Sequence, residues 1–244
     1  MSEDKRLDVR RLRGLRAEQP VIPWVQLDSA PVPGEPGAEL RLKRRGAEFS
    51  IMLGTNELMN SRMGGSEEAL ARLALARLGD RPEPAVLIGG LGMGFTLRAA
   101  LAELGPAGVM VAELVPAVVA WANGPMAEVL QGCLDDPRVR VEETDVGLLI
   151  RAAERAWDAI LLDVDNGPEG LSRSSNDALY AAAGLSAAFR ALRPGGVLSV
   201  WSSGPDAGFT RRLLRAGFEV TEEKVRATGK RGARHVVWVA VRPA

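Results

Sequence analysis

The segment of this chain whose composition best suits ligand binding is Gly89-Gly90-Leu91-Gly92-Met93-Gly94. It follows a short apolar run and precedes a predicted helix. Glycines at such a turn allow positive φ and let a ligand come close to backbone N–H groups. A tight turn that binds no ligand can have the same composition, so the loop alone does not show that a ligand binds here. The expected cofactor contacts come from Gly89, Gly90, Gly92 and Gly94.

Acidic residues follow the later apolar runs, where strands are expected to end. Glu113 lies 19 residues after Gly94, and a carboxylate at that spacing can accept hydrogen bonds from both hydroxyls of a ribose. Asp145 follows the third run, where a carboxylate could accept a hydrogen bond from the amino group of an adenine. Asp163 and Asp165 follow the fourth run. Open α/β sheets bind ligands at the carboxyl ends of their strands, so we expect these acids to share one site with the glycine loop.

Two cofactor classes fit this pattern, nicotinamide dinucleotides and S-adenosyl nucleosides. The dinucleotide pattern is G-x-G-x-x-G, whose third glycine permits close packing of the helix. Here the glycines alternate at Gly90, Gly92 and Gly94. This spacing favours S-adenosylmethionine or its decarboxylated form, and leaves a nicotinamide oxidoreductase as a distant alternative.

The elements that would position these residues are short apolar runs without alternation, separated by helical stretches. Such runs are typical of strands that are buried on both faces, so the sequence predicts an α/β fold with a doubly wound, mostly parallel sheet. Two strand-like runs at 218–224 and 234–241 have no helix between them and predict an antiparallel hairpin at the sheet edge. The predicted parallel strands are 85–88, 109–112, 139–141, 159–162 and 197–200, and the predicted helices are 95–104, 116–122, 146–155, 175–192 and 206–216.

The N-terminal part has a different pattern. Residues 39–53 alternate between apolar and polar side chains, which predicts a β-hairpin. A helix is expected over 66–78, with Ser66 as its N-cap. We therefore divide the chain into an N-terminal arm with a small β-hairpin extension, residues 1–65, and a nucleoside-binding domain, residues 66–244.

The bulk composition narrows the function classes. The 31 basic and 31 acidic residues cancel, which argues against a nucleic-acid partner. With one cysteine and one histidine, the chain can form no internal disulfide and no Cys/His zinc site, and we expect no metal. The charged first twenty residues contain no apolar core, and no apolar run is long enough to span a bilayer. These features predict a cytoplasmic protein that acts on small molecules.

Several segments between Glu39 and Val241 resemble the spermidine synthase group of the class I S-adenosylmethionine-dependent methyltransferase superfamily. The resemblance implies a class I methyltransferase-like Rossmann fold and a homodimer. The segments that carry it are RRGAEF, GGLGMG, VAELVP, WDAILLDVDNGPEG and LRPGGVLSVWS.

The resemblance also implies roles for the matched positions. Residues Gly89–Gly94 would hold the tail and sulfonium region of the donor. Glu113 would bind the ribose and Asp145 the adenine. Asp163 would be the catalytic aspartate, which orients the attacking amine and helps to deprotonate it.

The acceptor end of the site has fewer matched positions. Asp165 and Glu169 could capture and help to deprotonate a cationic amine, or form a solvated turn. Arg62 could contact the donor's carboxylate, or lie in a linker between the hairpin and the main domain. Tyr180 is either a half-buried helix residue or a part of the acceptor site.

The departures from the family concern the same end of the site. Polyamine synthases typically carry an aspartate inside the glycine loop, where this chain has Leu91 and Met93, and a second aspartate where it has Asn166. We predict a transferase that moves an aminopropyl group from an S-adenosyl-type donor to a small amine. A methyltransferase with another acceptor, or a nucleoside-binding protein without turnover, are the alternatives.

Overall fold

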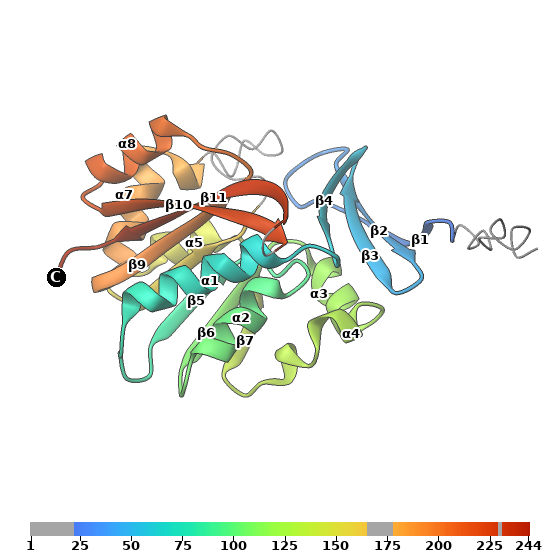
Figure 1. Ribbon diagram of the computed structural model, residues 1–244, viewed down its shortest axis with the longest axis horizontal. Helices are drawn as coiled ribbons and strands as arrows, with labels where there is room; N and C mark the ends of the chain where they lie inside the picture. The colour runs from blue at the N-terminus through green and yellow to red at the C-terminus, as the bar shows by residue number, and fades with distance from the viewer. Residues whose placement is uncertain (1–21, 165–177, 229–230) are drawn as a thin grey trace, which may run out of the picture.

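The computed structural model describes residues 22–164, 178–228 and 231–244. Figure 1 shows two sheets side by side, a small one formed by the N-terminal strands and a larger one with helices on both faces. Five strands of the larger sheet are parallel to one another, and β11 runs antiparallel to both of its neighbours. In sheet order its strands are β10 (Glu219–Thr228), β11 (Arg231–Val241), β9 (Leu192–Ser202), β8 (Trp157–Leu162), β5 (Ala85–Gly89), β6 (Gly108–Glu113) and β7 (Val139–Glu143).

This arrangement confirms the predicted doubly wound sheet with an antiparallel hairpin at one edge. The last strand of the chain, β11, inserts between β9 and β10. Successive side chains of β5 belong to different apolar clusters: Val86 and Ile88 pack on one face, Leu87 on the other. The strand is thus buried on both faces, which is why its sequence shows no alternation.

The helices lie close to the predicted ranges and differ mainly at their ends. Helix α1 begins after Gly64, so Ser66 is not the N-cap but a buried residue of the first turn. Gly64 adjoins the ring of Phe95 so closely that a Cβ there would overlap it. The described helices are α1 (Gly65–Leu78), α2 (Phe95–Glu103), α3 (Pro116–Asn123), α4 (Ala127–Leu130), α5 (Val146–Ala152), α7 (Ala182–Ala191) and α8 (Ala207–Arg215), with a 3-10 turn at Cys133–Asp135. The fourth predicted helix, 175–192, was wrong as one continuous helix. Residues 175–177 lie outside the described residues, and the rest is interrupted at Ala181, whose backbone is extended.

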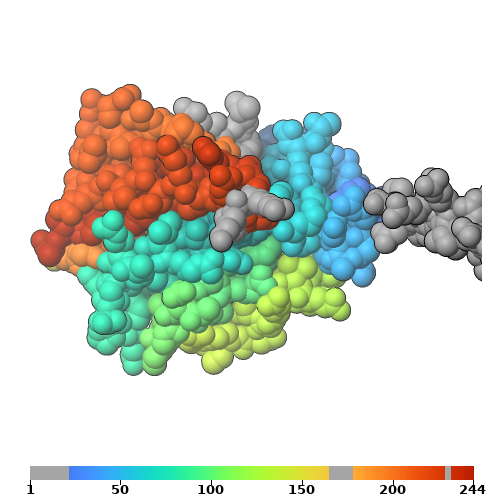
Figure 2. Space-filling model, viewed as in Figure 1, coloured from blue at the N-terminus to red at the C-terminus, as the bar shows by residue number. Residues whose placement is uncertain are grey.

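The N-terminal sheet contains the predicted hairpin, in which Leu42 pairs with Ile51, and two further strands. Its buried face joins the same apolar cluster as Val118, and Trp121 Nε1 donates a 2.7 Å hydrogen bond to Asp28. Figure 2 shows this sheet in blue, in contact with the larger part of the molecule. The small sheet therefore forms one wall of any site between it and the larger part of the molecule. Its strands are β1 (Val25–Pro31), β2 (Glu39–Arg45), β3 (Glu48–Leu53) and β4 (Asn56–Asn60).

Candidate active site

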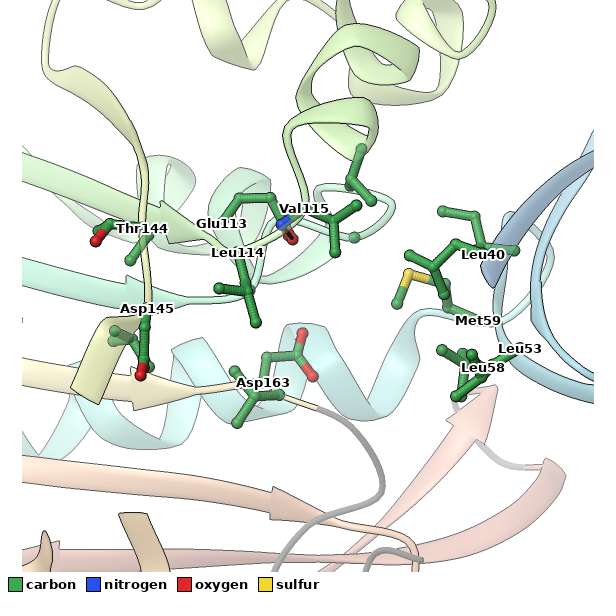
Figure 3. Close-up of a pocket in the computed structure, with 17 residues that line it drawn as sticks. Leu40, Leu53, Leu58, Met59, Glu113, Leu114, Val115, Thr144, Asp145 and Asp163 are labelled. Atoms are coloured by element: carbon green, nitrogen blue, oxygen red, sulfur yellow. Dashed lines mark hydrogen bonds between the residues drawn. The ribbon is translucent and has the colours of Figure 1, made fainter. Parts of the chain in front are cut away.

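A cavity lies between the carboxyl ends of the parallel strands and the N-terminal sheet. Figure 3 shows Glu113, Asp145 and Asp163 on one side of this space and Leu40 and Met59 on the other. We call it the donor cavity. It is lined by Leu40, Ile51, Leu53, Leu58, Met59, Gly90, Gly92, Ala112, Glu113, Leu114, Val115, Val118, Thr144, Asp145, Val146, Asp163 and Val164.

The glycine loop forms the floor of the donor cavity in a conformation that side chains would prevent. Gly90 has a φ of +92°, and a Cβ there would overlap the backbone oxygen of Asp163. A Cβ at Gly92 would lie 2.9 Å from the sulfur of Met59. The loop is fixed to its neighbours, since the Gly90 N–H donates to the carbonyl of Ala112 and the Asp163 N–H to that of Gly89, each at 2.9 Å. Because neither Gly90 nor Gly92 has a side chain, the loop lines the donor cavity with backbone atoms.

Glu113 connects the glycine loop to the end of β6. Its side chain is buried, and its two carboxylate oxygens accept 2.9 Å hydrogen bonds from the N–H groups of Leu91 and Val115. A carboxylate oxygen has two lone pairs and can accept more than one hydrogen bond. The carboxylate is thus held in a fixed orientation on the cavity wall, as the binding of ribose hydroxyls requires.

Asp145 lies at the end of the donor cavity near β7 and α5. It is the N-cap of α5, and its Oδ1 accepts a 2.7 Å hydrogen bond from the N–H of Gly147. Leu114 and Val146 are apolar neighbours on the same wall. Apolar walls with a fixed carboxylate at their edge suit a flat heterocycle that carries an amino group.

Asp163 stands at the boundary between the donor cavity and a smaller second cavity. Its Oδ2 accepts a 2.7 Å hydrogen bond from the Thr96 hydroxyl. Burial raises the pKa of Asp163 to about 7, the negative charge of Glu67 adds to this, and the Thr96 hydrogen bond opposes it. A carboxyl with that pKa can take up and release protons near neutral pH.

The second cavity adjoins the glycine loop at the first turn of α1. It includes Glu67, which is not among the site residues predicted from the sequence. Burial raises the pKa of Glu67 as well, while the Ser66 hydroxyl donates a 2.6 Å hydrogen bond to its carboxylate. The second cavity is lined by Leu58, Met59, Glu67, Leu91, Gly92, Met93, Phe95, Asp163 and Trp201.

Curated proteins with similar sequences are polyamine aminopropyltransferases, and no protein-family model matches the chain. Polyamine aminopropyltransferase 1 of Streptomyces coelicolor is 34% identical over 152 residues, which are 59% of this chain and 28% of the relative. The polyamine aminopropyltransferase of Mycobacterium tuberculosis H37Rv is 34% identical over 146 residues, 56% and 27% of the two chains. The chain therefore spans less than a third of the length of these relatives.

Solved structures with a similar fold include spermidine synthases. A spermidine synthase from Thermotoga maritima has a TM-score of 0.72 at 19% identity, covering 89% of this chain and 72% of that one. A spermidine synthase in complex with the transition state analogue AdoDATO has a TM-score of 0.71 with the same identity and coverage. The fold of the chain is spermidine synthase-like. This confirms the resemblance and the fold predicted from the sequence.

The spermidine synthase-like fold brings Gly90, Gly92, Glu113, Asp145 and Asp163 together around the donor cavity. The predicted contacts Gly89 and Gly94 line neither cavity, and neither do Arg62 and Tyr180. Arg62 forms ion pairs with Glu48 and Glu57, at 3.3 and 3.2 Å, and lines neither cavity.

Tyr180 is buried in the core, edge-on to Phe209, and lines neither cavity. Asp165 and Glu169 lie outside the described residues. The roles predicted for these residues stay predictions.

In the part of the chain that the structure describes, no group of three or more His, Cys, Asp and Glu side chains could hold a metal ion. None of its helices is long and apolar enough to cross a membrane.

Proposed function

We propose that this protein transfers an aminopropyl group from an S-adenosyl-type donor to a small amine. The observation that carries the proposal is Asp163, a carboxyl with a pKa of about 7 between two cavities and beside the glycine loop. The polyamine aminopropyltransferases among its relatives support the reaction class.

The donor cavity fits the adenosine part of such a donor. Glu113 would accept hydrogen bonds from the ribose and Asp145 from the adenine amino group, with the bare backbone of Gly90 and Gly92 beside the sulfonium. We propose the decarboxylated form of S-adenosylmethionine as the donor, because the second cavity presents Glu67 and Asp163 and no Lys, Arg or His among its described lining residues.

The reaction requires a neutral amine nitrogen. An alkyl amine with a pKa near 10 arrives as a cation, so a base must remove a proton before attack. Asp163 would accept that proton. The nitrogen then bonds to the aminopropyl carbon that is attached to sulfur, and the bond between that carbon and sulfur breaks. The electron pair of the broken bond stays on sulfur, which becomes a neutral thioether. Holding both reactants in line supplies much of the rate increase.

Methyl transfer from S-adenosylmethionine is the second candidate. It is favoured by the glycine loop, which carries Leu91 and Met93 and no charged residue. A homodimer and a cytoplasmic location are further proposals, supported by the resemblance and by the composition; light scattering of the purified protein tests the first.

Product mass separates the two reactions. The protein is incubated with S-adenosylmethionine or its decarboxylated form, together with putrescine or spermidine. A gain of about 57 Da in the amine indicates aminopropyl transfer and a gain of about 14 Da methyl transfer. The Asp163→Asn variant should form product far more slowly, whereas Glu219→Gln, at an exposed carboxylate on β10, should match the unmodified protein. Methylated amine as the sole product would refute the proposal.

A further inference from the structure

The second cavity combines apolar walls with two carboxylates. Six of its lining residues are Leu, Met, Phe or Trp, and Glu67 and Asp163 are its two charged groups among the described residues. Such a space suits an alkyl chain that ends in a cation, because the walls cover the methylene groups and a carboxylate binds the charge.

The two cavities adjoin at the glycine loop. Leu58, Met59, Gly92 and Asp163 line both of them. If the adenosine part of a donor lies in the donor cavity, a substituent on its sulfur can extend past Gly92 along the loop. That path ends beside Glu67.

Resting on the function proposed above, we propose that Glu67 binds the ammonium end of the donor's aminopropyl group and thereby selects a decarboxylated donor over S-adenosylmethionine. The tail of S-adenosylmethionine also carries a carboxylate. Two carboxylates in a partly dehydrated cavity repel that group, whereas they attract an ammonium.

Glu67 is held in place for this contact. The buried Ser66 donates its hydroxyl hydrogen bond to Glu67 Oε2, and Thr96 Oγ1 lies 3.3 Å from the Glu67 carbonyl oxygen while bonding Asp163. Thr96 has one hydroxyl hydrogen, which it donates to Asp163 at the shorter distance, so this residue fixes the side chain of Asp163 while it lies against the backbone of Glu67. Preorganised carboxylates lose little entropy when a cation binds.

The other charged groups near the second cavity are already engaged. Glu68 pairs with Arg72 at 2.8 Å on the outer side of α1. Arg98 packs on the ring of Phe95, 5.0 Å from its centroid, and does not line the cavity.

His235 stacks on Trp201, and burial lowers its pKa, which favours the neutral form. Described residues therefore present no cation that would hold a donor carboxylate there.

Calorimetry with three nucleosides tests the assignment. Methylthioadenosine has no aminopropyl group, the decarboxylated donor has one that ends in an ammonium, and S-adenosylmethionine has a carboxylate in addition. The unmodified protein should bind the decarboxylated donor at least about tenfold more tightly than S-adenosylmethionine. Glu67→Gln should remove most of that preference and leave methylthioadenosine binding unchanged. Glu68→Gln, one residue along the same helix, should behave as the unmodified protein for all three ligands.

The outcomes separate this inference from the function on which it rests. Equal affinity of the unmodified protein for both donors, or an unchanged preference in Glu67→Gln, overturns the role of Glu67 alone, because methylthioadenosine binding would still support the donor cavity. Failure to bind any of the three ligands overturns the proposed function as well. If Glu67→Gln does not fold, Glu67→Asp replaces it and should retain part of the preference; full retention would overturn the assignment.

Discussion

The hydroxyl of Thr96 donates a 2.7 Å hydrogen bond to Oδ2 of Asp163 and so joins the first turn of α2 to the end of β8. The bond stabilises the ionised form of a carboxyl whose burial favours the protonated form. Because Thr96 lies two residues after Gly94, one segment of the chain both shapes the donor cavity and adjusts the basicity of Asp163.

We expect Thr96→Val to shift the pH dependence of the reaction. A base must be ionised to accept a proton, so kcat/KM should rise with pH through an apparent pKa of about 7. Without the hydrogen bond the pKa of Asp163 rises, and the rising limb should move up to about pH 8, which corresponds to about 1.4 kcal/mol. Thr210→Val, the same change at α8 far along the chain, is the matched control. A limb that stays in place would argue against Asp163 as the base.

Asp163→Asn should stabilise the protein at alkaline pH. In the unfolded chain this carboxyl has a pKa near 3.9, whereas in the native state it is about 7. Between these values the native state binds the additional proton, so the contribution of Asp163 to stability falls as pH rises through that window. In urea unfolding at pH 8, the unfolding free energy of the variant should exceed that of the unmodified protein by roughly 1–3 kcal/mol. This is less than the full effect of the pKa shift, because water in the cavity screens the charge.

The control for this experiment is the pH itself. At pH 4 the carboxyl is protonated in the native state and about half protonated in the unfolded chain, so its titration changes stability by less than about 1 kcal/mol. The variant and the unmodified protein should then unfold at similar urea concentrations. The exposed Glu219→Gln should show no such pH-dependent gain. A gain of equal size at pH 4 and pH 8 would show that the stability change does not come from the titration of Asp163.

Gly90→Ala should disrupt the loop more than its backbone angle alone explains. Gly37 offers a matched control, since its φ is +82° and a Cβ there meets nothing within 4 Å. Left-handed strain should lower the unfolding free energy of Gly37→Ala by about 1–2 kcal/mol. At Gly90 the overlap with the Asp163 carbonyl adds a cost of about 1–3 kcal/mol. Similar losses in the two variants would contradict this account of the loop.

The sequence predicted the part of the site that strand ends determine. In parallel strands the carboxyl ends meet at one sheet edge, so apolar runs followed by Glu113, Asp145 and Asp163 are sufficient to place those acids together. The order of β10 and β11 did not follow from the sequence, because two strands without an intervening helix can pair at either position.

Glu67 was missed for a different reason. Acids in the first turn of a helix are explained by the helix dipole, and neither Glu67 nor Glu68 stands out. A signal was present, since the buried positions Leu70, Ala74 and Leu78 continue back along the same helix face to Glu67, whereas Glu68 pairs with Arg72. The sequence did not reveal that this face meets a cavity there.

We expect Glu113→Ala to weaken both the fold and the binding of nucleosides. The change leaves the N–H groups of Leu91 and Val115 without their carboxylate partner, which should cost about 1–3 kcal/mol of unfolding free energy. Affinity for methylthioadenosine should fall by about tenfold or more. Glu142→Ala changes a nearby acid that pairs with Arg140 and does not line the cavity, so its affinity should be unchanged. Undiminished affinity in Glu113→Ala would exclude the ribose contact.

Arg62→Ala tests whether this residue contacts a donor carboxylate. In the structure its guanidinium pairs with Glu48 and Glu57 and lies over the ring of Trp24, so the variant should lose a little thermal stability through the N-terminal sheet. Its affinity for S-adenosylmethionine and for methylthioadenosine should equal that of the unmodified protein in calorimetry. Only S-adenosylmethionine carries the carboxylate, so a selective loss for that ligand would show that Arg62 turns toward the site when a donor binds. An equal loss for both ligands would instead show that the N-terminal sheet supports the cavity wall.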